Sequence, residues 1–240
     1  MEKLVYTIFG SDLDGERGLQ LRHALAALEG PHRLQLNLPE RAFTGGQEPI
    51  RNLLPAFDGA VFVWVDSRRD RAPLEALLQE LDIGFHGYAV CESVPMPARL
   101  PEPDGDGAVD ALSQLVLLRK PREADYARWL SAWIDAHTPV AIACQGTVAY
   151  EQNIVQAALT DNAPPLHGIV EECFPAAAYG DLDLFFAGGG DRERLQGNIR
   201  RLLESSGRVA APDALDRIFT ARHIPAAAQS AGAAGAAVTP

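Results

Sequence analysis

The sequence predicts an α+β protein in which two tandem ferredoxin-like β-α-β-β-α-β repeats form one barrel with an interior pocket. Two observations lead to this fold class. Apolar residues recur at strand and helix spacing in the same order in two portions of similar length, residues 1–95 and 111–225. Between them, residues 96–110 are rich in Pro, Gly and Asp, which is typical of a linker. Two such sheets can pack face to face, or join edges into a closed barrel that leaves no strand edge exposed.

The first portion contains six expected elements. Strands are predicted at residues 4–9, 33–38, 60–65 and 87–94. Leu34, Leu36 and Leu38 alternate with polar residues, which is strand period. The two helices are predicted from apolar stripes, with Leu21, Ala24, Leu25 and Leu28 in the first and Leu74, Leu77, Leu78 and Leu81 in the second. Pro73 suits the first turn of the second helix.

The second portion repeats this order. Strands are predicted at residues 112–118, 147–155, 169–174 and 217–224, and helices at residues 123–137 and 192–203. The first of these helices carries Tyr126, Trp129, Leu130, Trp133 and Ile134 on one face. Residues 226–240 are rich in Ala and Gly and are expected to form a flexible tail.

The composition argues against several classes of function. A formal net charge of −11 argues against a nucleic-acid partner and against an anionic membrane surface, because both attract clustered Lys and Arg. Neither a signal peptide nor an apolar stretch of about 20 residues is visible, so we expect a cytoplasmic protein that does not span a membrane. The cysteines are odd in number and widely spaced, and the histidines lack ligand spacing, so neither a disulfide framework nor a metal site is expected.

Motifs in the second portion resemble those of the EthD family, a branch of the dimeric α+β barrel proteins. Trp129-Leu130 followed by His137-Thr138-Pro139 is similar to the family's Trp-containing helix that ends in His-x-Pro. Tyr150-Glu151-Gln152-Asn153 is similar to its Tyr-x-Gln-Asn strand. His167-Gly168-Ile169-Val170-Glu171 with Phe174 is similar to its Asp-Gly-x-x-Glu-x-x-Phe strand.

The terminal strand up to His223 completes the likeness, which covers about half of the chain. The first portion is similar only in architecture, since Glu29-Gly30-Pro31-His32 stands in place of His-x-Pro and only Asn37 remains of Tyr-x-Gln-Asn. Family members usually build the barrel from two chains. The resemblance therefore implies a pseudo-dimeric barrel formed by a tandem duplication with a degenerate first repeat. A homodimer of the fused chain is left open.

His137 is the first candidate for chemistry. It extends the apolar stripe of its helix, so its side chain is expected to point toward the sheet. At the predicted helix C-terminus the dipole favours the imidazolium, whereas burial disfavours it. Such an imidazole can act as a general acid or base near neutral pH. The structural alternative is a buried His that bonds to a carbonyl.

Strand alternation restricts the remaining candidates. Tyr150 and Gln152 share one face of their predicted strand, Glu151 and Asn153 share the other, and the sequence does not decide which face meets the pocket. Of the adjacent Glu171 and Glu172, one faces inward, and a carboxylate held in an apolar barrel has a raised pKa. The structural alternatives are that Tyr150 and Gln152 only pack within the sheet, and that the glutamate is a solvated charge. With the resemblance, the predicted catalytic residues are His137, Tyr150 and Glu171, and the predicted substrate-binding residues are Trp133, Gln152, Asn153, Phe174 and His223.

The resemblance implies a small apolar molecule, aromatic or polyketide-like, bound in the barrel pocket. It also implies cofactor-independent proton transfer, in a lyase, dehydratase or oxygenase reaction. The alternative is a non-catalytic ligand-binding or accessory protein of a degradation or biosynthesis pathway, which would use the same pocket. Because relatives of this fold bind haem, a haem-handling barrel is a lesser alternative.

Overall fold

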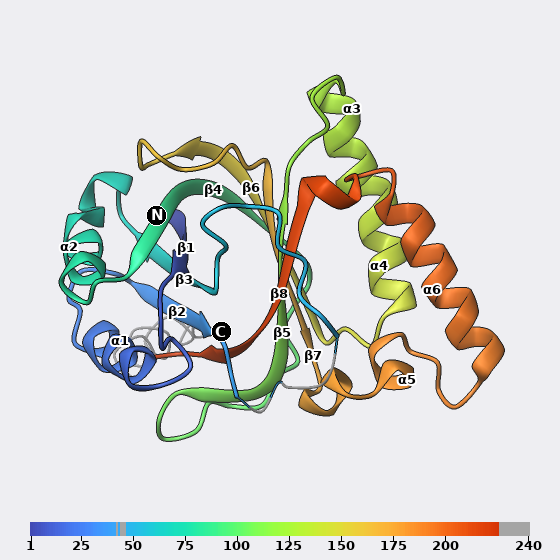
Figure 1. Ribbon diagram of the computed structural model, residues 1–240, viewed down its shortest axis with the longest axis horizontal. Helices are drawn as coiled ribbons and strands as arrows, with labels where there is room; N and C mark the ends of the chain where they lie inside the picture. The colour runs from blue at the N-terminus through green and yellow to red at the C-terminus, as the bar shows by residue number, and fades with distance from the viewer. Residues whose placement is uncertain (42, 44–46, 226–240) are drawn as a thin grey trace, which may run out of the picture.

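The computed structural model describes residues 1–41, 43 and 47–225, and the predicted tail at 226–240 lies outside these residues. The molecule is an α+β protein built around a closed antiparallel barrel (Figure 1). In the described chain the strands follow the order β1-β3-β2-β8-β5-β7-β6-β4 around this barrel. The predicted α+β class and the closed barrel are therefore confirmed.

The elements lie close to the predicted positions. The strands are β1 (Glu2–Phe9), β2 (Arg33–Leu38), β3 (Gly59–Val65), β4 (Gly84–Met96), β5 (Ala108–Leu118), β6 (Ala149–Ala158), β7 (Gly168–Phe174) and β8 (Leu215–His223). The helices are α1 (Glu16–Ala26), α2 (Ala72–Glu80), α3 (Tyr126–Ser131), α4 (Thr138–Cys144), α5 (Leu182–Phe185) and α6 (Arg192–Ser206), with a π-helical segment η2 (Ala132–His137) between α3 and α4. Because β5 begins at Ala108, the end of the predicted linker belongs to a strand.

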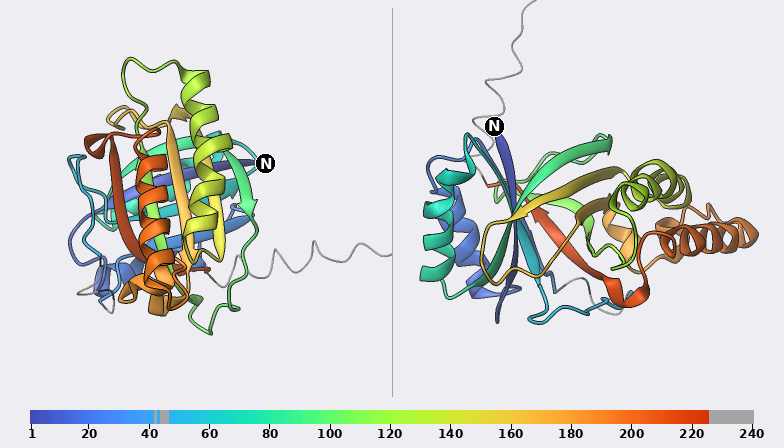
Figure 2. Two further views of the ribbon diagram at one scale, coloured as in Figure 1. Left: turned by 90° about the vertical axis from the view of Figure 1, so that its right-hand side faces the viewer. Right: turned by 90° about the horizontal axis from the view of Figure 1, so that it is seen from above.

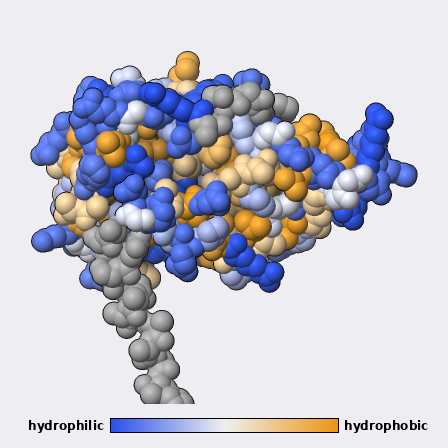
Figure 3. Space-filling view, turned by 90° about the horizontal axis from the view of Figure 1, so that it is seen from below, coloured by the Kyte–Doolittle hydropathy of each residue, from blue (hydrophilic) through white to orange (hydrophobic). Residues whose placement is uncertain are grey.

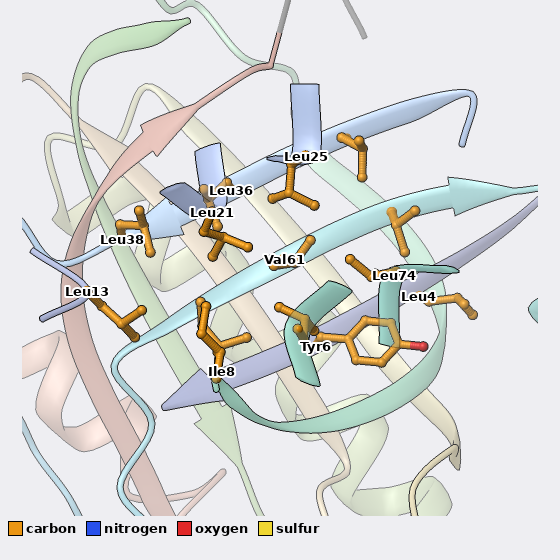
Figure 4. Packing of buried hydrophobic residues seen from close by; sticks show 14 of the residues in the cluster. Leu4, Tyr6, Ile8, Leu13, Leu21, Leu25, Leu36, Leu38, Val61 and Leu74 are labelled. Carbon is orange, nitrogen blue, oxygen red and sulfur yellow. The ribbon is translucent and has the colours of Figure 1, made fainter. Parts of the chain in front are cut away.

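Helices cover the outside of the barrel on two sides (Figures 1 and 2). α1 and α2 lie on the outer face of the first portion, and α3, α4 and α6 lie on that of the second. Under α1 and α2, every second residue of the strands joins the helix stripes in an aliphatic core that includes Leu4, Ile8, Leu21, Leu25 and Leu36 (Figure 4). None of the helices in the described part of the chain has the length and apolar character of a membrane span.

Apolar side chains fill part of the inside of the barrel. Val5, Phe62, Trp64, Leu115 and Ile218 form an apolar core there, and all of them are buried. The sequence predicted a pocket in this space. Large side chains from β3 occupy part of it, and a cavity of about 210 Å³ remains beside inward-facing residues that include Glu151, Glu171 and Arg222. The cavity described below lies outside the barrel, under the helices.

A buried carboxylate links the two portions across the barrel. Glu171 of β7 accepts hydrogen bonds from Gln35 and Asn37 of β2 at 2.7 and 2.8 Å, from Ser113 of β5 at 2.9 Å and from Arg222 of β8 at 3.1 Å. Burial raises the pKa of Glu171, but the charge of Arg222 and these hydrogen bonds outweigh it, so the pKa lies below its ordinary value. The raised pKa expected for Glu171 is therefore wrong.

The helix predicted at residues 123–137 continues well beyond that range. α3, η2 and α4 form one rod that ends at Cys144 (Figure 1). The rod accommodates Pro139, which has no backbone N–H, because the π-helical turn changes the hydrogen-bond pattern before it. The hydroxyl of Thr138 also donates a hydrogen bond to the Trp133 carbonyl at 3.0 Å. His137 thus lies in the middle of the rod, and the expected stabilisation of its cation by a helix C-terminus is absent.

The connection between β2 and β3 is fastened to β8. Ile50 and Arg217 exchange two backbone hydrogen bonds, of 2.9 and 2.8 Å. The buried carboxylate of Asp216 accepts hydrogen bonds from the backbone of Asn52 and Leu53, at 2.5 and 2.9 Å, and pairs with Arg119 at 2.7 Å. Through these contacts, a segment of the first portion lies beside the outer face of the strands of the second portion.

We expect Glu171→Gln to destabilise the fold by about 3 kcal/mol, because the variant leaves the buried Arg222 charge without its counter-charge. Equilibrium unfolding in urea measures the change. Asp82→Asn is the control, since the Asp82 side chain is 94% exposed in its pair with Arg17 and should leave the midpoint unchanged. Equal midpoints for Glu171→Gln and the wild type would mean that this network does not hold the barrel together.

Candidate functional site

A cavity of about 200 Å³ lies between the outer face of β5–β8 and the helical layer that includes η2 and α6. Most of its wall is apolar, as in Val116, Trp133, Phe185, Leu202 and Val209. The polar residues that line it are Gln114, His137, Gln145, Tyr150, Glu172, Ser206 and Arg217. An apolar cavity with a few convergent polar groups is the usual form of a small-molecule site.

The cavity reaches the molecular surface beside α6. Leu203 belongs to its lining and is 66% exposed. Leu182 and Leu184 of the neighbouring α5 are also exposed. Figure 3 shows apolar surface gathering on the side of the molecule where α5 and α6 lie. A small apolar molecule therefore has a route from solvent to the cavity.

Strand register places the central polar groups in one row. Gln114 of β5 and Tyr150 of β6 both pair with Glu172 of β7. Because paired residues point to the same face of a sheet, all three side chains face the helices. Gly168 lets the helical layer come close, since a Cβ at this position would lie 2.4 Å from the ring of Trp133.

Glu172 is the buried titratable group of this row. Its side chain accepts hydrogen bonds from the amide nitrogens of Gln114 at 2.8 Å and Gln145 at 3.2 Å. Burial raises the pKa of Glu172 to about 7, although these hydrogen bonds partly oppose the shift. Near neutral pH the carboxyl therefore exists in both protonation states, as a general base requires.

Tyr150 and His137 are neutral groups of the same cavity. Burial and the nearby charge of Glu172 raise the pKa of Tyr150 far above its ordinary value. Burial lowers the pKa of His137 to about 4, and its Nδ1 lies 3.0 Å from the Ser205 hydroxyl. At neutral pH both side chains can form hydrogen bonds with a ligand, but neither carries charge.

Arg217 adds a positive charge to the cavity. Its Nη2 donates to the Glu48 carbonyl at 3.1 Å, and its guanidinium lies over the ring of Phe219. The buried Nε has no hydrogen-bond partner. Burial lowers the pKa of Arg217 and Glu172 opposes that shift, while arginine stays protonated in proteins. The cavity thus pairs a base with a cation.

Some of the predicted site residues meet here. Trp133, His137 and Tyr150 all line the cavity. Gln152 faces the same side of the sheet, but its amide donates to the Thr138 hydroxyl at 2.6 Å beneath the rod. Phe174 stacks on Phe185, with ring centroids 4.3 Å apart, and so supports the cavity wall from behind.

The other predicted residues lie elsewhere. Glu171 and Asn153 point into the barrel, where Asn153 donates to the Ile169 carbonyl at 3.3 Å. His223 lies at the end of β8, beside α1. Glu171 and His137 thus lie on opposite sides of the sheet and line different cavities, whereas Tyr150 lines both of these cavities.

Sequence reasoning missed most of the polar groups around the base. The sequence leaves open which of Glu171 and Glu172 shares a face with Tyr150, and only the register of β6 and β7 shows that it is Glu172. Gln145 directly follows α4, which lies beyond the predicted helix end at residue 137. The sequence predicts a strand at Arg217 but no role for its side chain. The pairing of Gln114 with Glu172 needs the sheet order, for which the sequence carries no local signal.

Comparison with known proteins reveals similarity only at the level of structure. No protein-family model and no curated protein matches the sequence. An anthrone oxidase-like protein superposes with a TM-score of 0.52 and 13% identity, over 93% of this chain and 91% of that chain. The chain therefore shares the fold of this protein. At this identity the likeness concerns the fold alone.

Two further solved structures are more distant. A candidate monooxygenase of Fusobacterium nucleatum has a TM-score of 0.43 and 8% identity, over 93% of this chain and 92% of that chain. A candidate chlorite dismutase has a TM-score of 0.44 and 10% identity, over 97% of this chain and 99% of that chain.

Glu172→Gln should change how stability depends on pH. The folded protein retains the Glu172 proton up to a pKa of about 7, whereas an ordinary carboxyl of pKa 4.5 has released it. Below pH 4.5 the raised pKa of Glu172 stabilises the folded state by roughly 3 kcal/mol, and this stabilisation is lost as the pH rises through 7. The variant lacks that loss, so its stability relative to the wild type should increase between about pH 5 and pH 8.

Urea unfolding of both proteins across this range measures the effect. Comparison of the two cancels the opposite contributions of His137 and His223, whose pKa values are both lowered to about 4. Glu204→Gln, an exposed change on α6, should follow the wild type at every pH. If the Glu172→Gln and wild-type curves are parallel, the carboxyl does not titrate near neutrality.

Proposed function

We propose that the cavity under η2 and α6 binds a small, mostly apolar aromatic molecule, and that Glu172 removes a proton from it without a bound cofactor. The observation that carries the proposal is the carboxyl of Glu172, which is buried in an apolar cavity with a pKa raised to about 7. A base of this strength accepts a proton from a weakly acidic O–H or activated C–H group at physiological pH.

The size of the cavity limits the ligand. An apolar cavity of about 150 Å³ holds benzene, so the 200 Å³ found here suits one substituted ring or two fused rings. Sites for drug-sized ligands begin near 300 Å³, and haem therefore does not fit these residues. Among the described residues, no cluster of three or more His, Cys, Asp or Glu side chains is placed to hold a metal ion.

The proposed step is a single proton transfer. The proton moves from a ligand carbon or oxygen to Glu172, and the electron pair of the broken bond stays on the ligand as an enolate or phenolate. Arg217 stabilises this anion by its charge, and Tyr150 donates a hydrogen bond to its oxygen. Gln114 and Gln145 hold the carboxyl in place. His137, neutral at this pH, orients the ligand and does not act as the base.

The anion then has two routes. It can expel a leaving group, as in a lyase or dehydratase, or it can pass electrons to molecular oxygen, as in an oxygenase. Both routes begin with the same base and cation. The requirement for oxygen therefore distinguishes the reaction types, and the site described here serves either.

We further propose that the chain is a tandem fusion of two ferredoxin-like repeats, residues 1–95 and 111–225, of which the second is EthD-like. The same strand order in the two portions supports this, since β4-β1-β3-β2 corresponds to β8-β5-β7-β6. The seams are the pairs β2–β8 and β4–β6. In this proposal the first repeat contributes Ile50 to the cavity of the second.

The test uses a panel of phenols, naphthols and aryl ketones. Calorimetry measures binding, and mass spectrometry of the products measures turnover with and without oxygen. We expect the wild type to bind and convert at least one member. Glu172→Gln should bind it with similar affinity but lose at least about 100-fold in turnover, because the general base is gone. Glu204→Gln removes the same charge from the surface of α6 and should behave as the wild type in both measurements.

Each other outcome has a distinct meaning. Full turnover by Glu172→Gln would remove Glu172 from the mechanism. Binding by the wild type without any conversion would identify a ligand-binding or accessory protein. Absence of binding across the whole panel would reject an aromatic ligand for this cavity.

A further inference from the structure

Another cavity, of about 210 Å³, is lined by residues of α1, of the end of β8 and of the loop between β4 and β5. Figure 1 shows these elements on the other side of the barrel from α6. Its lining includes Leu19, Arg22, His23, Asp106, His223 and Pro225. Three of these residues are basic. The barrel separates this cavity from Glu172, so the proposed function makes no use of it.

Arg22 brings a positive charge to this cavity without a counter-charge. It is half-buried on α1, and its Nε is inaccessible and has no hydrogen-bond partner. Within the described residues its guanidinium forms no ion pair, in contrast to Arg17 on the same helix, which lies 3.7 Å from Asp82. Buried charges in proteins are normally paired. Among the described residues, none supplies a counter-charge to Arg22.

His223 faces the same cavity and also lacks a partner. The residue is 6% exposed, and its Nδ1 is buried without a hydrogen bond. Burial and the charge of Arg22 lower the pKa of His223 to about 4, while the more weakly acting Glu40 and Asp104 oppose this. Two basic groups thus share a cavity, and neither the Arg22 Nε nor the His223 Nδ1 has a hydrogen-bond partner among the described residues.

We infer that this cavity is a binding site for a small oxyanion, namely a phosphate or carboxylate group. An oxyanion between Arg22 and His223 accepts hydrogen bonds from both and supplies a negative charge beside the Arg22 guanidinium. His23, exposed on α1, adds a third basic group at the rim.

The acidic groups nearby do not fill this role. Asp104 is engaged within its own loop, where its Oδ1 accepts from the backbone of Asp106 at 2.9 Å and of Ala108 at 2.8 Å. Asp106 is exposed at the rim and forms no ion pair with Arg22 in the described structure. Glu40 is exposed and does not line the cavity.

Inorganic phosphate and acetate are the probes, titrated separately into the full chain and followed by calorimetry. We expect Arg22→Met, which keeps the aliphatic stem and removes the charge, to weaken phosphate binding at least about tenfold. Arg17→Met removes an equal charge from the same helix outside the cavity and should bind as the wild type does. Tighter binding of acetate than of phosphate would identify a carboxylate ligand, and the reverse a phosphate ligand.

A second measurement needs no variant. Nuclear magnetic resonance of the imidazole ring follows the titration of His223 with and without saturating sulfate, an oxyanion whose own charge stays constant. The pKa of His223 should rise when the anion is bound, because the anion favours the imidazolium, and binding should tighten as the pH falls. Equal binding by Arg22→Met and the wild type, no binding of either probe, or an unmoved His223 titration would each overturn the inference.

Discussion

The barrel depends on a carboxylate that is held inside it by an arginine. Glu171 on β7 takes its hydrogen bonds from side chains of β2, β5 and β8, so one group fixes the positions of three other strands. This matters most at the seam of β2 and β8, where only three residue pairs are in register within the described strands. A short seam of backbone bonds is weakly specified, and a charged network across it resists slippage.

The same constraint sets the chemistry on the outer face. Because β7 is fixed by Glu171, the next residue, Glu172, must point toward the helices. The two carboxyls then meet opposite surroundings. Inside the barrel an arginine and several donors stabilise the anion, whereas under the helices burial dominates and two glutamine amides only partly offset it. Adjacent residues of one type therefore have pKa values shifted in opposite directions, on the two faces of one sheet.

The strands and helices could be predicted well because buried apolar residues recur with the period of a strand or a helix. The alternating leucines of residues 33–38 correspond to β2, and the stripe in residues 192–203 lies within α6. The sequence predicted the site less well, because the face of a strand depends on register with neighbours that are distant in the chain. Tyr150 and His137 lie at the cavity, yet the choice of Glu171 over Glu172 turned on a pairing that no local pattern encodes. Likewise, His-Thr-Pro reads as a helix end, and only the π-helical turn explains why the helix continues through it.

That turn has a further consequence for the shape of the cavity. A π-helical turn amounts to one residue more than the regular helix needs, and one residue rotates everything after it by about 100°. Trp129 precedes η2 and Gln145 follows α4. Both side chains are buried against the same sheet, with the additional residue of the π-helical turn between them. Deleting a single residue between them would aim another side of α4 at β7 while the barrel stayed intact. A change of one residue in the rod would thus present a different set of side chains to the cavity while the barrel remained the same.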